Sequence, residues 1–239
     1  GWNWNAGEST VSNSDGTRTS NVRANPQAGI SIATFTGNGS SGATVGHGLG
    51  VAPQVIIMKT RTSGDHWAVY HYKLGNTKIV YLNLTNSPAT SSGYWNNTTP
   101  SSSVFTLGND NKTNKSGDNY VAYCFNDVES FSKFGSYDGN NANDGTYVHL
   151  NFRPAFLMVK RTDSTRDWLI YDSARSTTNT IDDFLEPNEA TAEQTSSSRS
   201  VDFLSNGFKF RNNSGDMNGS GTYIYFAFAE FPFKNAIAR

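Results

Sequence analysis

One pattern occurs twice in the chain, as "GVAPQVIIMKTRTSGDHWAVYH" at Gly50–His71 and as "NFRPAFLMVKRTDSTRDWLIYD" at Asn151–Asp172. Aligned without a gap, the two stretches share identical residues at a constant spacing of 101, among them Pro53 and Pro154, Lys59 and Lys160, Trp67 and Trp168, and Tyr70 and Tyr171. Similarity at a fixed and long spacing is typical of an internal repeat.

The match extends on both sides of these stretches. Upstream, "TFTGNG" (Thr34–Gly39) corresponds to "SYDGNN" (Ser136–Asn141). Downstream, "SVFTLGNDNKTNKSGDNYVAYCF" lies over "NGFKFRNNSGDMNGSGTYIYFAF" at a spacing near 103. The order of the matches is kept throughout, so we predict two tandem copies of one domain, at residues 29–129 and 130–239.

The first residues carry the pattern with which each copy ends. "WNWN" (Trp2–Asn5) alternates aromatic and small residues, as do "YCFN" (Tyr123–Asn126) and "FAFA" (Phe226–Ala229). We therefore interpret residues 1–28 as the closing strand of a preceding copy plus a connector. An ordinary edge strand at the N-terminus is the alternative.

The composition indicates an all-β protein. Of the 239 residues, 13% are aromatic, too many for a disordered chain, while Leu, Glu, Lys and Ala are too few for a mainly helical one. Short segments bounded by Gly, Asn, Asp and Ser favour two tandem jelly-roll or lectin-like β-sandwiches. One short helix is expected in the second copy, within Thr180–Gln194. The expected strands are Gly29–Thr36, Gln54–Thr60, Trp67–His71, Thr77–Leu84, Ser103–Leu107, Asn119–Asn126, Lys133–Tyr137, Ala155–Arg161, Trp168–Asp172, Val201–Leu204, Gly207–Arg211 and Thr222–Ala229.

Charge and hydropathy argue against several classes of partner. The net charge is −1, which gives no electrostatic footprint for a nucleic acid. No apolar run approaches the roughly 20 residues of a membrane helix, so no membrane insertion is expected. Cys124 is the single cysteine and can form no intrachain disulfide, so stability must come from packing.

The sequence offers no catalytic motif, and we expect no enzyme, no cofactor and no metal ligands. Its four His residues and one Cys lack the spacing of a metal site. The oxygen-rich segment "DGNNANDG" (Asp138–Gly145) lacks the pattern of an EF-hand, and the sequence leaves open whether it binds Ca²⁺. Asp182, Asp183 and Glu186, with Asp172, could supply the paired carboxylates of a glycosidase, but acids also suit the first turn of the expected helix.

The connections that differ between the copies are the candidate ligand-binding sites, because binding residues concentrate on loops of a shared scaffold. Tyr94 and Trp95 stand beside Asn96 and Asn97 in a loop of the first copy only. Aromatic faces next to amides suit sugar rings, although aromatic side chains that cap the sandwich are an alternative. Asp182, Asp183 and Glu186 belong to the matching connection of the second copy.

Six aromatic residues are expected in the cores of the two copies, because they recur beside the apolar strands. These are Trp67, Tyr123, Phe125, Trp168, Phe226 and Phe228. Truncation of either Trp to Ala is then expected to cost about 3–5 kcal/mol.

Several stretches together resemble a repeat domain of tail-fibre and other large virion proteins of marine tailed bacteriophages. They are "ATVGHGLGVAPQVIIMKTR", "SFSKFGSYDGN", "FRPAFLMVKRTDS" and "VDFLSNGFKFR". The resemblance implies a protein of the extracellular virion that contacts a bacterial surface glycan or protein, next to other virion proteins. A purely structural part of a tail, shaft or capsid decoration is the alternative. We also expect a homo-oligomer, with a trimer as one form, since phage fibres are often trimeric and exposed strand edges tend to be covered. The resemblance implies no catalytic residues.

Overall fold

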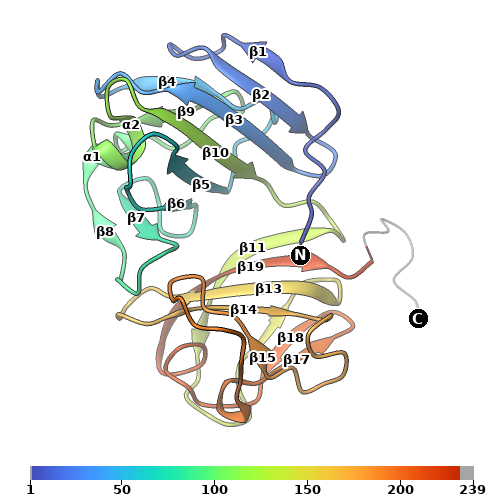
Figure 1. Ribbon diagram of the computed structural model, residues 1–239. Coiled ribbons are helices and arrows are strands. Elements are labelled where there is room, and N and C mark those ends of the chain that lie inside the picture. Colours follow the sequence, from blue (N-terminus) through green and yellow to red (C-terminus); the bar gives the residue numbers. More distant parts are fainter. Residues whose placement is uncertain (1, 232–239) are drawn as a thin grey trace. The chain divides into compact units, whose positions relative to one another are not determined.

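The computed structural model describes residues 2–231, which fold into two compact units (Figure 1). Unit 1 comprises residues 2–82 and Pro88–Asn126, and unit 2 comprises Asn83–Ser87 and residues 127–231. Both are built almost entirely of antiparallel strands, which confirms the all-β sandwich class. The described residues contain no helix long and apolar enough to cross a membrane.

Unit 1 is built on an antiparallel sheet of eight strands in the order β1-β2-β3-β10-β5-β6-β7-β8, with a separate pair β4-β9 (Figure 1). Two short helices follow the last strand of the sheet and β9. The elements are β1 (Val11–Asn13), β2 (Ser20–Asn25), β3 (Ile30–Thr36), β4 (Ala43–Gly46), β5 (Val55–Thr60), β6 (Ala68–His71), β7 (Lys78–Tyr81), β8 (Ala89–Thr90), α1 (Ser92–Trp95), β9 (Val104–Leu107), α2 (Asn111–Asn114) and β10 (Asn119–Phe125).

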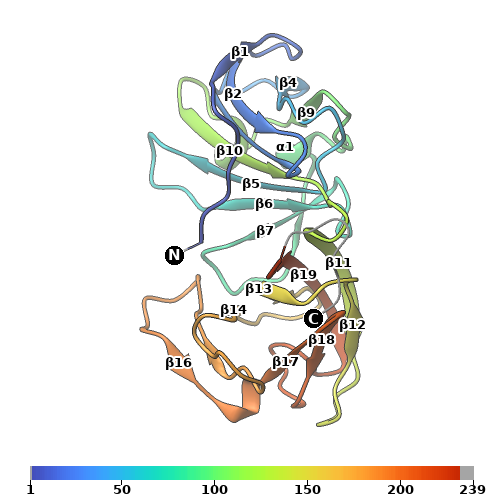
Figure 2. The same cartoon turned by 90° about the vertical axis from the view of Figure 1, so that its right-hand side faces the viewer.

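Unit 2 packs a four-stranded sheet, β11-β19-β13-β14, against a three-stranded sheet, β12-β18-β17, and adds the hairpin β15-β16 (Figure 2). The layer between the sheets holds Leu157, Tyr171, Phe203 and Phe208, all fully buried. The elements are β11 (Ser132–Gly139), β12 (Tyr147–His149), β13 (Pro154–Arg161), β14 (Trp168–Asp172), β15 (Asp183–Phe184), β16 (Gln194–Thr195), the 3-10 turn η1 (Ser197–Arg199), β17 (Val201–Leu204), β18 (Gly207–Phe210) and β19 (Gly221–Ala229).

The strand order of unit 1 returns in unit 2. The run β3-β10-β5-β6 corresponds to β11-β19-β13-β14, and the pair β4-β9 corresponds to β12-β18. The register agrees as well, because Lys59 lies opposite Val121 and Lys160 lies opposite Ile224. Equal patterns of apolar residues have thus produced the same arrangement of strands twice.

A buried asparagine joins two loops in each unit and forms the same set of hydrogen bonds. In unit 1 the Asn114 side chain accepts from the backbone N–H of Asn38 (2.9 Å), and its Nδ2 donates to the carbonyls of Ser40 (3.0 Å) and Gly108 (2.7 Å). In unit 2 the Asn218 side chain does the same with the backbone of Asn140 (3.3 Å), Ala142 (2.9 Å) and Asn212 (2.7 Å). Both side chains are fully buried, so this polar lock is part of the repeated fold.

The N-terminal segment differs from the prediction. Trp2–Asn5 is not a strand, and the expected connector instead forms the hairpin β1-β2, which pairs with β3. Because β2 occupies the edge of β3, the Trp2–Asn5 backbone has no sheet edge to join there. The Trp4 ring packs edge-on against Phe125, with 6.3 Å between the ring centroids. Residues 2–28 therefore belong to unit 1.

The prediction of a short helix in the second copy is also wrong. Within Thr180–Gln194 the chain forms β15 and then reaches β16, with Asp183 opposite Thr195. The Asp183 carboxylate accepts hydrogen bonds from the hydroxyls of Ser176 and Thr195 across this hairpin and so does not cap a helix. The two α-helical turns of the described chain, α1 and α2, lie in unit 1.

Four of the six expected core aromatics are buried. Phe125, Trp168, Phe226 and Phe228 are at most 9% exposed, and Trp168 is fully buried. Trp67 and Tyr123 are only half-buried, so the prediction is wrong for them. They lie on the face of the unit 1 sheet that points away from its core, which a repeat pattern alone does not reveal.

Candidate functional site

The predicted sugar-binding aromatics of unit 1 lie in its core. Ser91 caps α1 by accepting a hydrogen bond from the N–H of Gly93 (3.0 Å), and this turn directs Tyr94 and Trp95 inward, where they are 8% and 2% exposed. The Trp95 indole N–H donates to the carbonyl of Lys78 (3.1 Å), and the Tyr81 hydroxyl donates to that of Tyr94 (3.1 Å). These rings cannot stack on a sugar, so the prediction for them is wrong.

Asn96 and Asn97 have a backbone role instead. Both residues adopt left-handed φ angles of 51° and 50°, a conformation that Asn tolerates better than most residues. The Asn96 N–H donates to the carbonyl of Ser92 (2.9 Å) and so ends α1. The amides follow the buried rings in the chain, but they have no exposed aromatic face beside them in this turn.

The predicted acidic residues of unit 2 serve its internal structure. Asp183 accepts from the hydroxyls of Thr195 (2.5 Å) and Ser176 (2.9 Å), and these bonds hold the pKa of its carboxyl below the usual range. Glu186 is 9% exposed and forms an ion pair with Arg199. Asp182 is half-buried, and its carbonyl accepts from the N–H of Ser196 (2.9 Å).

Most of the carboxylates considered for glycoside hydrolysis have partners within unit 2. Each one is engaged with a neighbouring hydroxyl, amide or guanidinium, apart from Asp182, which contributes its backbone. Asp172 is bound to Arg175 at 2.8 Å, on another connection. The contacts of Asp183 and Glu186 stabilise the β15-β16 hairpin.

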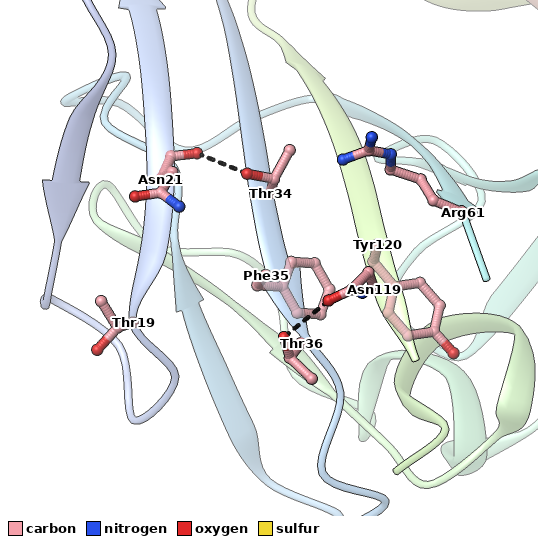
Figure 3. Close-up of a pocket in the computed structure, with 8 residues that line it drawn as sticks. All are labelled: Thr19, Asn21, Thr34, Phe35, Thr36, Arg61, Asn119 and Tyr120. Atoms are coloured by element: carbon pink, nitrogen blue, oxygen red, sulfur yellow. Dashed lines mark hydrogen bonds between the residues drawn. The ribbon is translucent and has the colours of Figure 1, made fainter. Parts of the chain in front are cut away.

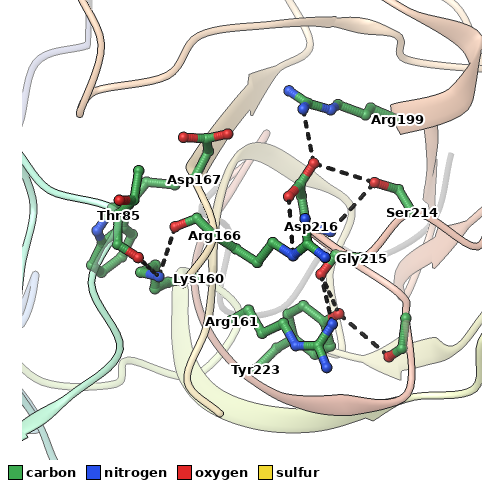
Figure 4. A network of polar contacts seen from close by, with 12 residues as sticks. Thr85, Lys160, Arg161, Arg166, Asp167, Arg199, Ser214, Gly215, Asp216 and Tyr223 are labelled. Carbon is green, nitrogen blue, oxygen red and sulfur yellow. Dashed lines mark hydrogen bonds and ion pairs between the residues drawn. The ribbon is translucent and has the colours of Figure 1, made fainter. Parts of the chain in front are cut away.

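A charged network holds the loop that precedes β19 (Figure 4). Arg199 binds Asp216 at 2.8 Å as well as Glu186, and Arg166 approaches Asp216 at 3.9 Å. The Tyr223 hydroxyl and the Arg161 guanidinium both donate to the carbonyl of Gly215. Groups that are paired and hydrogen-bonded in this way make a rigid loop, because each partner fixes the next.

The oxygen-rich segment Asp138–Gly145 has its carboxylates engaged by side chains of its own unit. Asp144 binds Lys209 at 2.5 Å and approaches Arg211 at 3.7 Å, and Asp138 accepts from the Thr222 hydroxyl (3.1 Å). Across residues 2–231, no group of three or more His, Cys, Asp or Glu side chains is placed to hold a metal ion.

A hollow that the sequence does not indicate lies on the outer face of the unit 1 sheet, across β2, β3 and β10 (Figure 3). It has a volume of about 350 Å³ and is mainly polar. The Thr36 hydroxyl donates to the Asn119 side chain (2.9 Å) between neighbouring strands, and Arg61 borders the same space. Hydroxyl, amide and guanidinium groups therefore line one end of this face.

A second hollow of about 500 Å³ continues the first one toward β5 and β6, since Thr34 and Arg61 line both. We define the open face as five of its lining residues, all outside the core of unit 1: Lys59, Arg61, Trp67, Val121 and Tyr123. Two large aromatic side chains and two cations meet here, from β5, β10 and the segment that joins β5 to β6. This open face is the best candidate site for recognition in the described chain, because it combines apolar area with charge.

One signal in the sequence could have found the open face. On β10, Val121 and Tyr123 alternate with the buried Tyr120, Ala122 and Cys124, so they must point to the opposite side of the sheet. That side also carries Lys59, a residue type that is rarely buried without a partner.

Comparison with known proteins places the chain in one family. It matches the family described as a domain of unknown function (DUF7483) over residues 1–232, nearly its whole length, and it belongs to that family. No curated protein and no solved structure matches the chain. The family description names no activity, ligand or partner.

Proposed function

We propose that this protein is a repeat-built structural component of a bacteriophage particle, of the tail-fibre kind. The observation that carries the proposal is the duplicated fold itself, with the same strand order and the same buried polar lock around Asn114 and Asn218. Extended assemblies gain length by repeating one stable unit, because each added copy folds in the same way as the others. The resemblance of the sequence to virion repeat domains is the reason to propose that this assembly is a phage particle.

The side chains favour the structural form of this proposal over the adhesive one. Tyr94 and Trp95, the residues expected to bind a host glycan, fill the core of unit 1. The apolar area that is accessible lies on the broad open face of a sheet, around Trp67 and Tyr123. Accessible apolar area of this kind on a sheet suits contact with another folded domain.

The ion pairs and hydrogen bonds within the loops support the same conclusion. In unit 2 the ion pairs of Arg199 hold the connection around Asp216, and Asn218 ties two further loops together. Buried and satisfied polar networks specify one conformation. Such loops suit a component that keeps its shape under load.

The test is to locate the chain in the particle. Particles of the phage that encodes it are purified, and the chain is sought by peptide mass spectrometry and by immunogold labelling. We expect the chain in stoichiometric amounts, with the label on a fibre, a shaft or the capsid surface. Its absence from purified particles, together with its presence in the lysate of infected cells, would contradict the proposal.

A further inference from the structure

The open face of unit 1 has a counterpart in unit 2 at equivalent positions of the sheet. Lys59 and Lys160 occupy the same register, opposite Val121 and Ile224 respectively. Two residues along the closing strands, Tyr123 of β10 corresponds to Phe226 of β19. The two faces are therefore the same surface of the repeat, found twice.

The unit 2 counterpart is buried. Lys160 and Trp168 are fully buried, and Ile224 and Phe226 are 1% and 2% exposed. In unit 1, the equivalent Lys59, Trp67, Val121 and Tyr123 are all half-buried. The same surface is thus buried in one unit and partly accessible in the other.

One segment of the chain lies against this surface of unit 2. The segment Asn83–Ser87, which follows β7 in the sequence, belongs to unit 2. The Lys160 ammonium donates to the carbonyl of Thr85 (3.0 Å) and to that of Arg166 (2.8 Å), and the Arg166 N–H also donates to the carbonyl of Thr85 (Figure 4). The segment between β7 and β8 therefore supplies a backbone acceptor to the lysine of this face.

The corresponding loop of unit 2 lies between β15 and β16. These strands pair as β7 and β8 do, and in both units the hairpin is followed by a helical turn, η1 or α1. The loop spans residues 185–193, and its part from Glu189 to Glu193 is exposed. It is the equivalent of the segment that supplies Thr85.

The charges of the loop and of the open face are complementary. The loop carries two acids on its exposed part: Glu193 forms an ion pair with Arg175, and Glu189 receives one long hydrogen bond from the Asn188 side chain (3.4 Å). The open face carries Lys59 and Arg61, so Glu189 is the acid available to them. Lys59 donates to the carbonyls of Thr60 (3.1 Å) and Ser63 (3.4 Å), both within the next turn of its own chain. Lys160 has in addition an acceptor from a distant segment, and the exposed loop of another copy can supply the equivalent acceptor to Lys59.

We propose that the open face of one copy binds the β15-β16 loop of a second copy, so that chains associate head to tail. The contact joins two different surfaces, and such contacts build open arrays or closed rings. Lys59 and Arg61 pair with Glu189 of the loop, while Trp67 and Tyr123 bury their exposed area against it. This inference rests on the proposed structural function, and it names the surface and the partner through which the assembly grows.

The test measures self-association of the purified chain by sedimentation equilibrium from micromolar to millimolar concentration. We expect concentration-dependent oligomers, and Lys59→Glu is expected to raise the dissociation constant at least about tenfold, because like charges then face each other. Glu189→Lys is expected to do the same. A mixture of the two variants is expected to restore association, because the carboxylate introduced on the open face then meets the ammonium introduced on the loop. A general loss of folding could not be rescued in this way.

Lys73→Glu is the matched control, since it makes the same change of charge in an exposed turn after β6. It is expected to leave the dissociation constant unchanged. A chain that stays monomeric at millimolar concentration overturns the inference, and so does association that Lys59→Glu leaves intact. Binding of a host oligosaccharide that quenches Trp67 fluorescence, without self-association, overturns it as well and assigns the face to a glycan. None of these outcomes depends on whether the chain is found in phage particles, so a failure here is distinct from a failure of the proposed function.

Discussion

The two copies of the fold differ in the burial of one equivalent surface. Trp168 of unit 2 is fully buried beside Phe226, with 6.0 Å between the ring centroids. Trp67 of unit 1 occupies the same position of the repeat and is half-buried. The difference shows that a repeated sequence pattern specifies which residues share a face of a sheet, while the exposure of that face depends on what lies over it.

The largest expected effect separates the two tryptophans. Trp168→Ala removes a fully buried ring and is expected to cost about 3–5 kcal/mol of unfolding free energy. Trp67→Ala is expected to cost less, about 1 kcal/mol, because its ring is only partly removed from water. Urea unfolding, followed by circular dichroism and fitted with a transition for each unit, measures both. Equal costs for the two variants would contradict the comparison.

The polar locks are expected to behave alike in the two units. Asn114→Ala and Asn218→Ala each remove the donor to two backbone carbonyls and the acceptor of one backbone N–H, which is expected to cost about 2–4 kcal/mol. The same unfolding experiment applies, with Asn38→Ala as the milder partner variant in unit 1. A large cost in one unit and none in the other would show that the lock is not a shared part of the fold.

The buried lysine is expected to make the stability depend on pH. Burial lowers the pKa of Lys160 to about 8, against about 10.4 in an unfolded chain. Between these values the unfolded state holds a proton that the folded state has lost, so the unfolding free energy rises with pH, by roughly 1–3 kcal/mol. The Lys160→Met variant is expected to lose this rise, and Lys59→Met is expected to keep it. Parallel pH profiles of the parent and Lys160→Met would contradict the assignment.

The smallest expected effect concerns the turn after α1, which has no counterpart with the same φ angles in the described part of unit 2. Asn97 holds a φ of 50°, so Asn97→Gly is expected to change the melting temperature little or to raise it slightly. Asn97→Ala is expected to cost about 1 kcal/mol, since alanine resists the left-handed region. Calorimetric melting of the two variants distinguishes a backbone role from a ligand-binding role, which predicts no change in stability for either.

Much of the fold can be predicted because it rests on periodic patterns. Strands such as β13 and β14 have continuous or alternating apolar residues, and the spacing near 101 transfers each assignment from one unit to the other. The sequence does not predict the short strands β4 and β12, because each buries a single large apolar residue, Val45 or Val148, and so carries too little of a pattern. The hairpin β15-β16 forms where the sequence predicts a helix, because acids near Pro187 suit a turn as well as a first helical turn.

The candidate site is harder to predict for a different reason. The difference between the copies favours exposed aromatics in the Tyr94–Asn97 loop, yet one turn of helix is enough to point two rings inward. The recurrence of Trp67 and Trp168 beside the same strand favours burial of both, yet Trp67 is half-buried. Sequence similarity between repeats cannot show which face has a neighbour, since the neighbour is not part of the repeated pattern.

Hydroxyl-radical footprinting of the purified chain tests the central claim most directly, because it measures the solvent access of each side chain in one experiment. We predict that Trp67 and Tyr123 are oxidised rapidly in dilute protein, while Trp168 and Phe226 are protected. At concentrations where the chain self-associates, Trp67 and Tyr123 become protected too. Equal oxidation of Trp67 and Trp168 in dilute protein would contradict the account, since the two copies would then present the same surface to solvent.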